Sequence, residues 1–168
     1  MEIRYRTPII RNGPRTIYTI RHGESEGNAR GLDDESLREQ PNHRFPLTPK
    51  GIKQISLSAQ YIKDEGLIGT ETGLYTSGFL RAQQAMEIIL EKQQSRCFKI
   101  CIEHKLDEWW KGIFHSLSDE EIEKYYKIEK MTRYREGWHH YRPPQGQAGK
   151  DVELNLISFM QDVLQAQL

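Results

Sequence analysis

Short apolar runs alternate along this chain with longer segments in which apolar residues recur at every third or fourth position. The runs at residues 17–20, 73–76 and 98–102 predict three short strands, since each is bounded by polar residues. Helical spacing follows the first two runs and returns near the end of the sequence. Strands that alternate with helices in this way are typical of an α/β protein.

Four segments carry helix signals. Thr48 precedes a proline and predicts a helix over about 49–64, with proline in the first helical position. Ser77 is expected to cap a second helix, and Ser118 begins a capping-box pattern that predicts a helix to roughly Glu129. The expected apolar faces are Ile52, Ile55, Ala59 and Ile62; Ala82, Ala85, Met86 and Ile89; and, in a final helix, Val152, Leu156, Phe159, Met160 and Val163.

These elements predict a single domain over residues 1–168, built as a three-layer α/β sandwich around a mainly parallel sheet. We expect residues up to 13 and the segment 29–43 to be mobile, and 141–146 to form a loop. In a parallel sheet the carboxyl ends of the strands meet at one edge, where ligands gather. The ends of the first two strands are therefore expected to lie close together.

Charge and cysteine content exclude several kinds of partner. The chain has 24 basic and 24 acidic side chains, so no overall field attracts it to nucleic acid or to a membrane. It has neither the apolar stretch of a signal peptide nor a segment long enough to span a membrane, and we expect it in the cytoplasm. Cys97 and Cys101 lie too far apart along a predicted strand for an easy disulfide, and the ligand spacings predict no metal site.

Side chains near the predicted strand ends have the types that phosphoryl transfer requires. His22 and Arg21 follow the first strand, Arg81 lies in the helix after the second, and Glu108 follows the third. Guanidinium groups can hold phosphate oxygens, a neutral imidazole can attack phosphorus, and a carboxylic acid can protonate the leaving oxygen. Taken singly, such residues are most often solvated or structural. Because three separate segments supply complementary groups to one sheet edge, we interpret them as a site.

Four motifs in this order resemble those of the histidine phosphatase superfamily, which also contains the cofactor-dependent phosphoglycerate mutases. The segment RHGESEGN at 21–28 is similar to the superfamily signature, and LTPKG at 47–51 to its L-T-x-x-G segment. The segment SGFLRA at 77–82 is similar to S-x-x-x-R-A, and LDE at 106–108 with the following Gly112 to L-x-E-x-x-x-G. Residues 141–152 resemble the Y-R-x-P-x-G-E-S loop and D-V helix of broad-range phosphatases and plant mutase-like proteins.

The resemblance implies a phosphoglycerate mutase-like fold that hydrolyses phosphate monoesters through a phosphohistidine at His22. Arg21 and Arg81 would hold the phosphate, and Glu108 would act first as proton donor and then as base. Asn28 and Glu24 would line the site. No cofactor or metal is implied, since arginine supplies the positive charge. The expected partner is a phosphorylated small molecule.

The tryptophans after the acid motif depart from the mutases, which carry a basic and tyrosine-containing segment there. Trp109 and Trp110 cannot grip a substrate carboxylate, so we expect a less anionic ester, aromatic or bulky, and leave a mutase as the third alternative. For each of these residues, and for Trp138, a place in the core is the favoured interpretation. At least one of the first two is nevertheless expected to border the site.

The superfamily's second catalytic histidine has no counterpart in this sequence. It lies in an apolar strand that ends in S-H-G or T-H-G, and no such strand follows Asp151. We expect the sequence to be C-terminally incomplete and to lack a central strand beside 17–20. Two alternatives stay open: a degenerate phosphate-binding or regulatory protein, or replacement of the histidine by His139 or His140.

The G-E-S turn of the resembling branch is also altered, to Gly146, Gln147 and Ala148. Loss of one donor to a developing oxyanion typically costs on the order of a hundred- to a thousand-fold in rate, so we expect impaired activity. An unpaired strand edge at the gap would favour a homodimer or aggregation.

Overall fold

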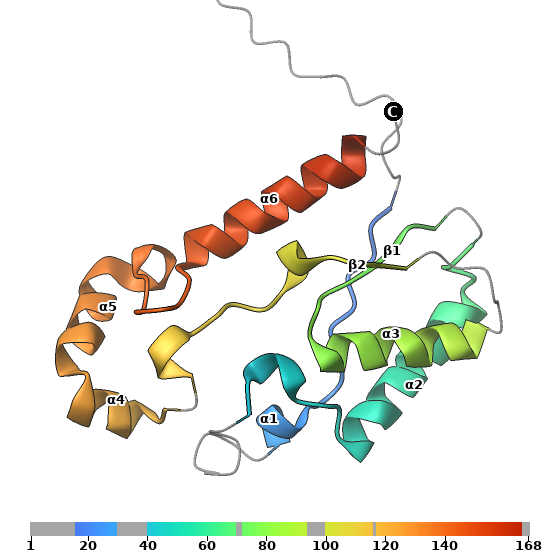
Figure 1. Cartoon of the computed structure of the whole chain (residues 1–168). Coiled ribbons are helices and arrows are strands. Elements are labelled where there is room, and N and C mark those ends of the chain that lie inside the picture. Colours follow the sequence, from blue (N-terminus) through green and yellow to red (C-terminus); the bar gives the residue numbers. More distant parts are fainter. Residues whose placement is uncertain (1–15, 30–39, 70–71, 94–99, 116, 166–168) are drawn as a thin grey trace, which may run out of the picture.

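Two parallel strands lie between helices in the computed structural model of this protein, which describes residues 16–29, 40–69, 72–93, 100–115 and 117–165 (Figure 1). The α-helices are α1 (Glu26–Ala29), α2 (Pro49–Asp64), α3 (Leu80–Gln93), α4 (Asp119–Tyr125), α5 (Lys127–His140) and α6 (Gly149–Gln165). The strands are β1 (Leu74–Thr76) and β2 (Ile100–Ile102), and the 3-10 turns are η2 (Asn42–Arg44), η3 (His104–Leu106) and η4 (Gly112–Phe114).

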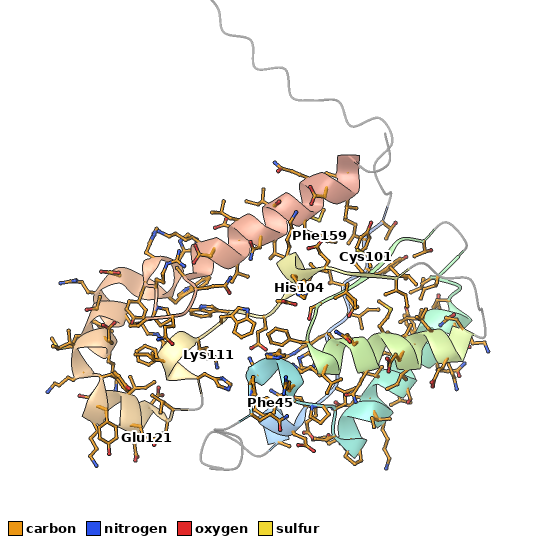
Figure 2. The ribbon with its side chains drawn as sticks, in the orientation of Figure 1. Phe45, Cys101, His104, Lys111, Glu121 and Phe159 are labelled. Atoms are coloured by element: carbon orange, nitrogen blue, oxygen red, sulfur yellow. The ribbon has the colours of Figure 1, made fainter. Side chains whose placement is uncertain are left out.

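The strands form the middle layer of the fold. Leu74 of β1 lies opposite Ile100 of β2 in parallel register. Figure 1 shows α2 and α3 on one side of the strand pair and α6 on the other. On the α6 side, the ring of Tyr75 lies 5.1 Å from that of Phe159, which Figure 2 places between α6 and the strands. This arrangement confirms the predicted α/β class with a parallel sheet.

The main core lies between α2 and α3. Ile55, Ala59 and Ile62 are buried against Ala85 and Ile89, as the helical spacing predicts. Burying an isoleucine side chain stabilises a fold by roughly 1.5–3 kcal/mol, so these contacts fix the pair of helices that carries the site. A second buried cluster, Phe114, Ile122 and Tyr141, joins η4 and α4 to the loop after α5.

The predicted helix starts are confirmed at two of three positions. Thr48 accepts a hydrogen bond from the amide of Gly51 at 3.0 Å and caps α2. Ser118 caps α4 with the full capping box. Ser77 does not begin α3: its hydroxyl accepts from the amide of Phe79 at 3.1 Å, which closes a turn before the helix starts.

The helix expected to continue to Glu129 ends earlier. Tyr126 has φ −132° and ψ 39°, which breaks the helix after Tyr125, and α5 starts at Lys127. In α6, Leu156 is 45% exposed although the spacing placed it on the buried face. The prediction for Leu156 is wrong, since within the described residues it is exposed while Phe159 of the same helix packs on Tyr75. Ile52 of α2 is likewise exposed.

The predicted strand at 17–20 is also wrong. These residues form no strand, and Ile17, Tyr18 and Ile20 are about half exposed. A strand persists only through hydrogen bonds to a neighbour, and within the described residues the sheet pairs β1 with β2 alone. Residues 98–99, Cys97 and the segments 1–13 and 30–39 lie outside the described residues. Of the helices within those residues, none has the length and apolarity needed to cross a bilayer.

Candidate active site

The imidazole of His22 is held in one tautomer by its two neighbours. Its Nδ1 lies 2.6 Å from the carbonyl oxygen of Gly23, which can only accept a hydrogen bond. Its Nε2 lies 3.0 Å from Nε of Arg81, which can only donate. The proton is therefore on Nδ1, and Nε2 carries the lone pair that a nucleophilic imidazole needs.

The surroundings of His22 disfavour protonation of that lone pair. Burial is the largest influence and lowers the pKa of His22 below its ordinary value of 6.5, while the hydrogen bond to Gly23 opposes it. The positive charges of Arg81 and Arg21 lower this pKa further, and the charge of Glu108 raises it. The net effect is a neutral imidazole around pH 7.

Arg81, in the first turn of α3, stands at the centre of the site and is 3% exposed. Its Nε donates to His22, its Nη1 donates to the backbone carbonyl of Asn42 at 2.7 Å, and its Nη2 forms an ion pair with Glu108. Its guanidinium carbon also lies 4.7 Å from the ring centre of Phe79. Burial lowers the pKa of Arg81 and the charge of Glu108 raises it, but an arginine stays protonated in proteins. One buried cation thus joins three segments of the chain.

Glu108 reaches Arg81 on a loop that its neighbour Asp107 holds in place. The carboxylate of Asp107 accepts from the amide of Gly78 at 2.6 Å and lies 3.0 Å from Nδ1 of His104. These contacts tie the loop after η3 to the turn between β1 and α3. The side chain of Glu108 is 49% exposed, so its carboxyl can exchange protons with water while it contacts the buried guanidinium.

Glu24 links residues 21–24, the RHGE loop, to the start of α2. Its carboxylate accepts from the hydroxyl of Thr48 at 2.9 Å and pairs with the ammonium of Lys50 at 2.8 Å. The Lys50 hydrogen bond, and then that of Thr48, lower the pKa of Glu24. A Cβ at Gly23 would lie 2.2 Å from the carbonyl oxygen of Gly51, so glycine is required for this close approach. These contacts are structural, and a contact of Glu24 with substrate stays a prediction.

Asn28 and Arg21 do not share the direct contacts that join His22, Arg81 and Glu108. The amide oxygen of Asn28 accepts from the hydroxyl and the amide of Ser25, at 2.9 and 3.2 Å, and so stabilises the turn into α1. Arg21 is exposed and acts on His22 through its charge. The structure therefore brings His22, Arg81 and Glu108 into contact, and Asn28 supports the loop beside them.

Three contacts of the site have no signal in the sequence patterns. The carbonyl of Asn42 and the ring of His43 lie in the segment expected to be mobile, and Phe79 precedes Arg81 inside the S-x-x-x-R-A motif. Phe79 occupies an unspecified position of that motif, so the motif gives no indication of its contact with Arg81. Trp110 is 42% exposed and Trp138 is 61% exposed, so the core interpretation of both is wrong.

A profile of the histidine phosphatase superfamily, branch 1, matches residues 17–167. This chain belongs to the histidine phosphatase superfamily. The match includes every motif from 21–28 to 141–152, so the family predicted from those motifs is confirmed.

Two proteins similar to this chain differ in how much of their length it spans. The phosphoglycerate mutase-like protein AT74H of Arabidopsis thaliana is 28% identical over 161 residues, which cover 89% of this chain and 53% of the relative. A 6-phosphofructo-2-kinase/fructose-2,6-bisphosphatase of Caenorhabditis elegans is 32% identical over 140 residues, covering 83% of this chain and 27% of the relative. The chain thus spans about half the length of the plant protein.

Solved structures share the fold. The alpha-ribazole phosphatase of Shigella flexneri superposes with a TM-score of 0.67 at 22% identity, covering 88% of this chain and 66% of that one. A mycobacterial glucosyl-3-phosphoglycerate phosphatase with bound inorganic phosphate gives a TM-score of 0.63 at 16% identity, covering 87% and 61%. These similarities confirm the phosphoglycerate mutase-like fold.

Gln147, which stands where the resembling branch has glutamate, holds the two adjacent tryptophans. Its backbone N–H donates to the carbonyl oxygen of Trp110 at 2.9 Å, and its side-chain oxygen accepts from the backbone N–H of Trp110 at 3.1 Å. Its own carbonyl accepts from the indole of Trp109. The altered turn therefore fixes the loop that follows Glu108.

His139 does not take the place of a second catalytic histidine at His22. Its Nε2 lies 2.8 Å from a carboxylate oxygen of Glu153, and its ring packs against Trp138 and His140 at the junction of α5 and α6. Figure 1 shows that this junction lies across the molecule from α3, which carries Arg81. In the part of the chain that the structure describes, no group of three His, Cys, Asp or Glu side chains is arranged to hold a metal. Cys101 is a free, exposed thiol.

Proposed function

We propose that this protein hydrolyses phosphate monoesters through a phosphohistidine intermediate at His22. One observation carries the proposal: Arg81 contacts both Nε2 of His22 and the carboxylate of Glu108. A phosphate bound to this buried guanidinium would adjoin a nucleophile on one side and a proton donor on the other. The family supports the same chemistry, since the proteins similar to this chain include phosphatases and mutase-like proteins.

In the first step, the lone pair on Nε2 of His22 attacks phosphorus and the bond from phosphorus to the ester oxygen breaks. The hydrogen bond from Nε of Arg81 must first turn from Nε2 to a phosphate oxygen, which frees the lone pair. The carboxylic acid of Glu108 gives its proton to the departing oxygen, so an alcohol leaves rather than an alkoxide. The Nδ1 proton stays on the ring and donates to the Gly23 carbonyl oxygen, which stabilises the positive charge that develops on the imidazole.

In the second step, water attacks phosphorus and the bond from phosphorus to nitrogen breaks. The carboxylate of Glu108, now deprotonated, accepts a proton from that water. Inorganic phosphate leaves, and the neutral imidazole of His22 and the acid form of Glu108 are restored. Arg81 balances the phosphate charge throughout, and its planar donor set suits this better than lysine would.

The proposal is tested by phosphate release from para-nitrophenyl phosphate. The wild-type protein should release phosphate, and His22→Ala should not. The phosphorylated intermediate should be trapped as an acid-labile, alkali-stable phosphoryl group on the wild-type chain alone. His139→Ala is the matched control, because this histidine is also partly exposed but lies at the α5–α6 junction. Release that survives His22→Ala refutes the assigned nucleophile.

The second candidate is a non-catalytic phosphate-binding or regulatory protein. It is favoured by the turn at residues 146–148, where Gln147 and Ala148 stand in place of the glutamate and serine of the resembling branch. Absence of phosphate release from wild type and variant alike, together with binding of inorganic phosphate that Arg81→Met abolishes, supports this candidate. A mutase is distinguished from both by interconversion of phosphoglycerate isomers.

A further inference from the structure

Three aromatic rings form a wall next to Arg81. The ring of His43 lies 6.3 Å from that of Phe79 and 5.8 Å from that of Trp110, and the last two lie 5.8 Å apart. The guanidinium of Arg81 sits over the same Phe79 ring. The rings come from η2, from the turn before α3 and from the loop after Glu108, so the fold gathers them from distant parts of the sequence.

Trp110 is the accessible member of this wall. Phe79 is 2% exposed, whereas Trp110 is 42% exposed. The backbone of Trp110 is nevertheless fixed on both sides by Gln147, which donates to its carbonyl and accepts from its amide. An exposed indole on a fixed backbone presents a defined apolar surface rather than a freely moving side chain.

His43 supports the wall from behind. Its Nδ1 is buried and has no hydrogen-bond partner among the described residues. The imidazole packs as a flat ring between Phe79 and Trp110. The wall therefore presents aromatic rings up to the edge of the Arg81 guanidinium.

We propose that Trp110 determines the substrate specificity of this site by packing against the aromatic leaving group of an aryl phosphate monoester. This inference rests on the proposed phosphomonoester chemistry, which places the phosphate on Arg81. The leaving oxygen must then face Glu108, which protonates it. The ring of Trp110 lies 5.8 Å from the Phe79 ring that the Arg81 guanidinium covers, so a group attached to that oxygen would meet the exposed indole.

Phosphonates test this inference without requiring turnover, because their bond from carbon to phosphorus is not hydrolysed. Calorimetry should show that the wild-type protein binds phenylphosphonate about tenfold more tightly than methylphosphonate, the effect of one favourable aromatic contact. Trp110→Ala should remove this preference and leave methylphosphonate affinity unchanged, and Trp110→Phe should retain most of it. Trp138→Ala, at an exposed tryptophan on α5, should keep the full preference.

An unchanged preference in Trp110→Ala overturns the inference, as does a wild-type protein that binds the two phosphonates equally or binds neither. Circular dichroism checks that Trp110→Ala is folded. If it is not, Trp110→Leu removes the ring but keeps apolar volume and carries the same expectation. A phosphonate preference without phosphate release contradicts only the proposed function. Phosphate release without the preference contradicts only the role of Trp110.

Discussion

Replacing Glu108 with glutamine tests this residue in two ways: as the counter-charge of buried Arg81, and as the group that a bound phosphate would displace from Arg81. The Arg81 side chain is 4% exposed, and its ion pair in the described part of the chain is with Glu108, whose side chain is 49% exposed. In Glu108→Gln the guanidinium keeps a hydrogen-bond acceptor of the same size but loses the opposite charge. A nearly buried cation without a counter-charge destabilises the fold.

The size of the effect follows from the exposure of the two partners. A hydrogen bond to a charged group contributes roughly 1.5–3 kcal/mol, and the half-exposed position of Glu108 screens part of this. We expect a loss of about 1–2 kcal/mol, which at about 2–4 °C per kcal/mol for a chain of this size lowers the midpoint of thermal unfolding by roughly 2–8 °C.

Inorganic phosphate should have the opposite effect on the variant. A ligand that binds the folded state stabilises it by an amount that grows with the logarithm of ligand concentration over Kd. Because Glu108 pairs with Arg81, a phosphate bound to Arg81 in the wild-type protein would have to compete with that carboxylate. Without that competitor, phosphate should bind Glu108→Gln more tightly and raise its unfolding midpoint by more than it raises that of the wild type. Turnover of para-nitrophenyl phosphate should be lost at the same time, because no carboxylate remains to accept a proton from the water that attacks the phosphohistidine.

Glu123→Gln is the matched control. The exposed fraction of the Glu123 side chain, 51%, is similar to that of Glu108, but its partner Lys130 is itself 45% exposed. Such a surface pair contributes about 0–1 kcal/mol, so this variant should unfold near the wild-type temperature and respond to phosphate as the wild type does. If Glu108→Gln behaves like this control in both measurements, the contact between Glu108 and Arg81 does not govern the site.

Three further predictions concern the surroundings of the site. Thr48→Ala should lower the urea-unfolding free energy by about 1 kcal/mol through loss of the α2 cap, while Thr48→Ser should keep it. Because folding lowers the pKa of His22, its contribution to stability is complete above pH 6.5 and is lost as pH falls through the lowered folded value. The stability of His22→Gln, measured across that range, should therefore depend less on pH than that of the wild type. Gly23→Ala places a Cβ 2.2 Å from a backbone oxygen and should cost roughly 1–3 kcal/mol or more in thermal unfolding, whereas Gly69→Ala, whose Cβ meets only a side-chain oxygen at 4.0 Å, should not. Equal midpoints for the two alanine variants would contradict the packing argument.

The sequence predicted a helix start well where the residues that stabilise it lie within one turn of the chain. The cap of α2 needs only Thr48 and Gly51, and the capping box of α4 needs only Ser118 and Glu121. The helix α5 gave no comparable signal, because its apolar residues do not form a face: Tyr134 in its middle is 92% exposed. Periodicity detects a helix through its buried side, so a helix that buries little escapes it.

Some contacts of the site could likewise be predicted from residue types, and others could not. The residue types and their order predicted that His22, Arg81 and Glu108 would meet, and the structure places them in contact. The same patterns did not predict that the carbonyl of Asn42 would accept from Arg81, or that Thr48 and Lys50 would hold Glu24. A backbone carbonyl has no residue type, and a contact across some 25 positions depends on the tertiary packing of α2 against the RHGE loop. The strand predicted at 17–20 failed for the same reason, since pairing is a property of its neighbours.

A single buried cation explains why these particular residues act together. Nε, Nη1 and Nη2 of Arg81 point to three different partners, and a lysine ammonium could not supply three fixed directions from one plane. The hydrogen bond from Nε of Arg81 sets the tautomer of the His22 imidazole. Burial and then the positive charge of Arg81 lower the pKa of that ring, so Arg81 affects both the tautomer and the protonation state of His22. Its burial makes an anionic partner necessary, and Glu108, being half exposed, is a partner that a phosphate dianion can displace. The contacts of Arg81 thus fit the proposed anion site, in which Glu108 would act as the acid next to a bound phosphate.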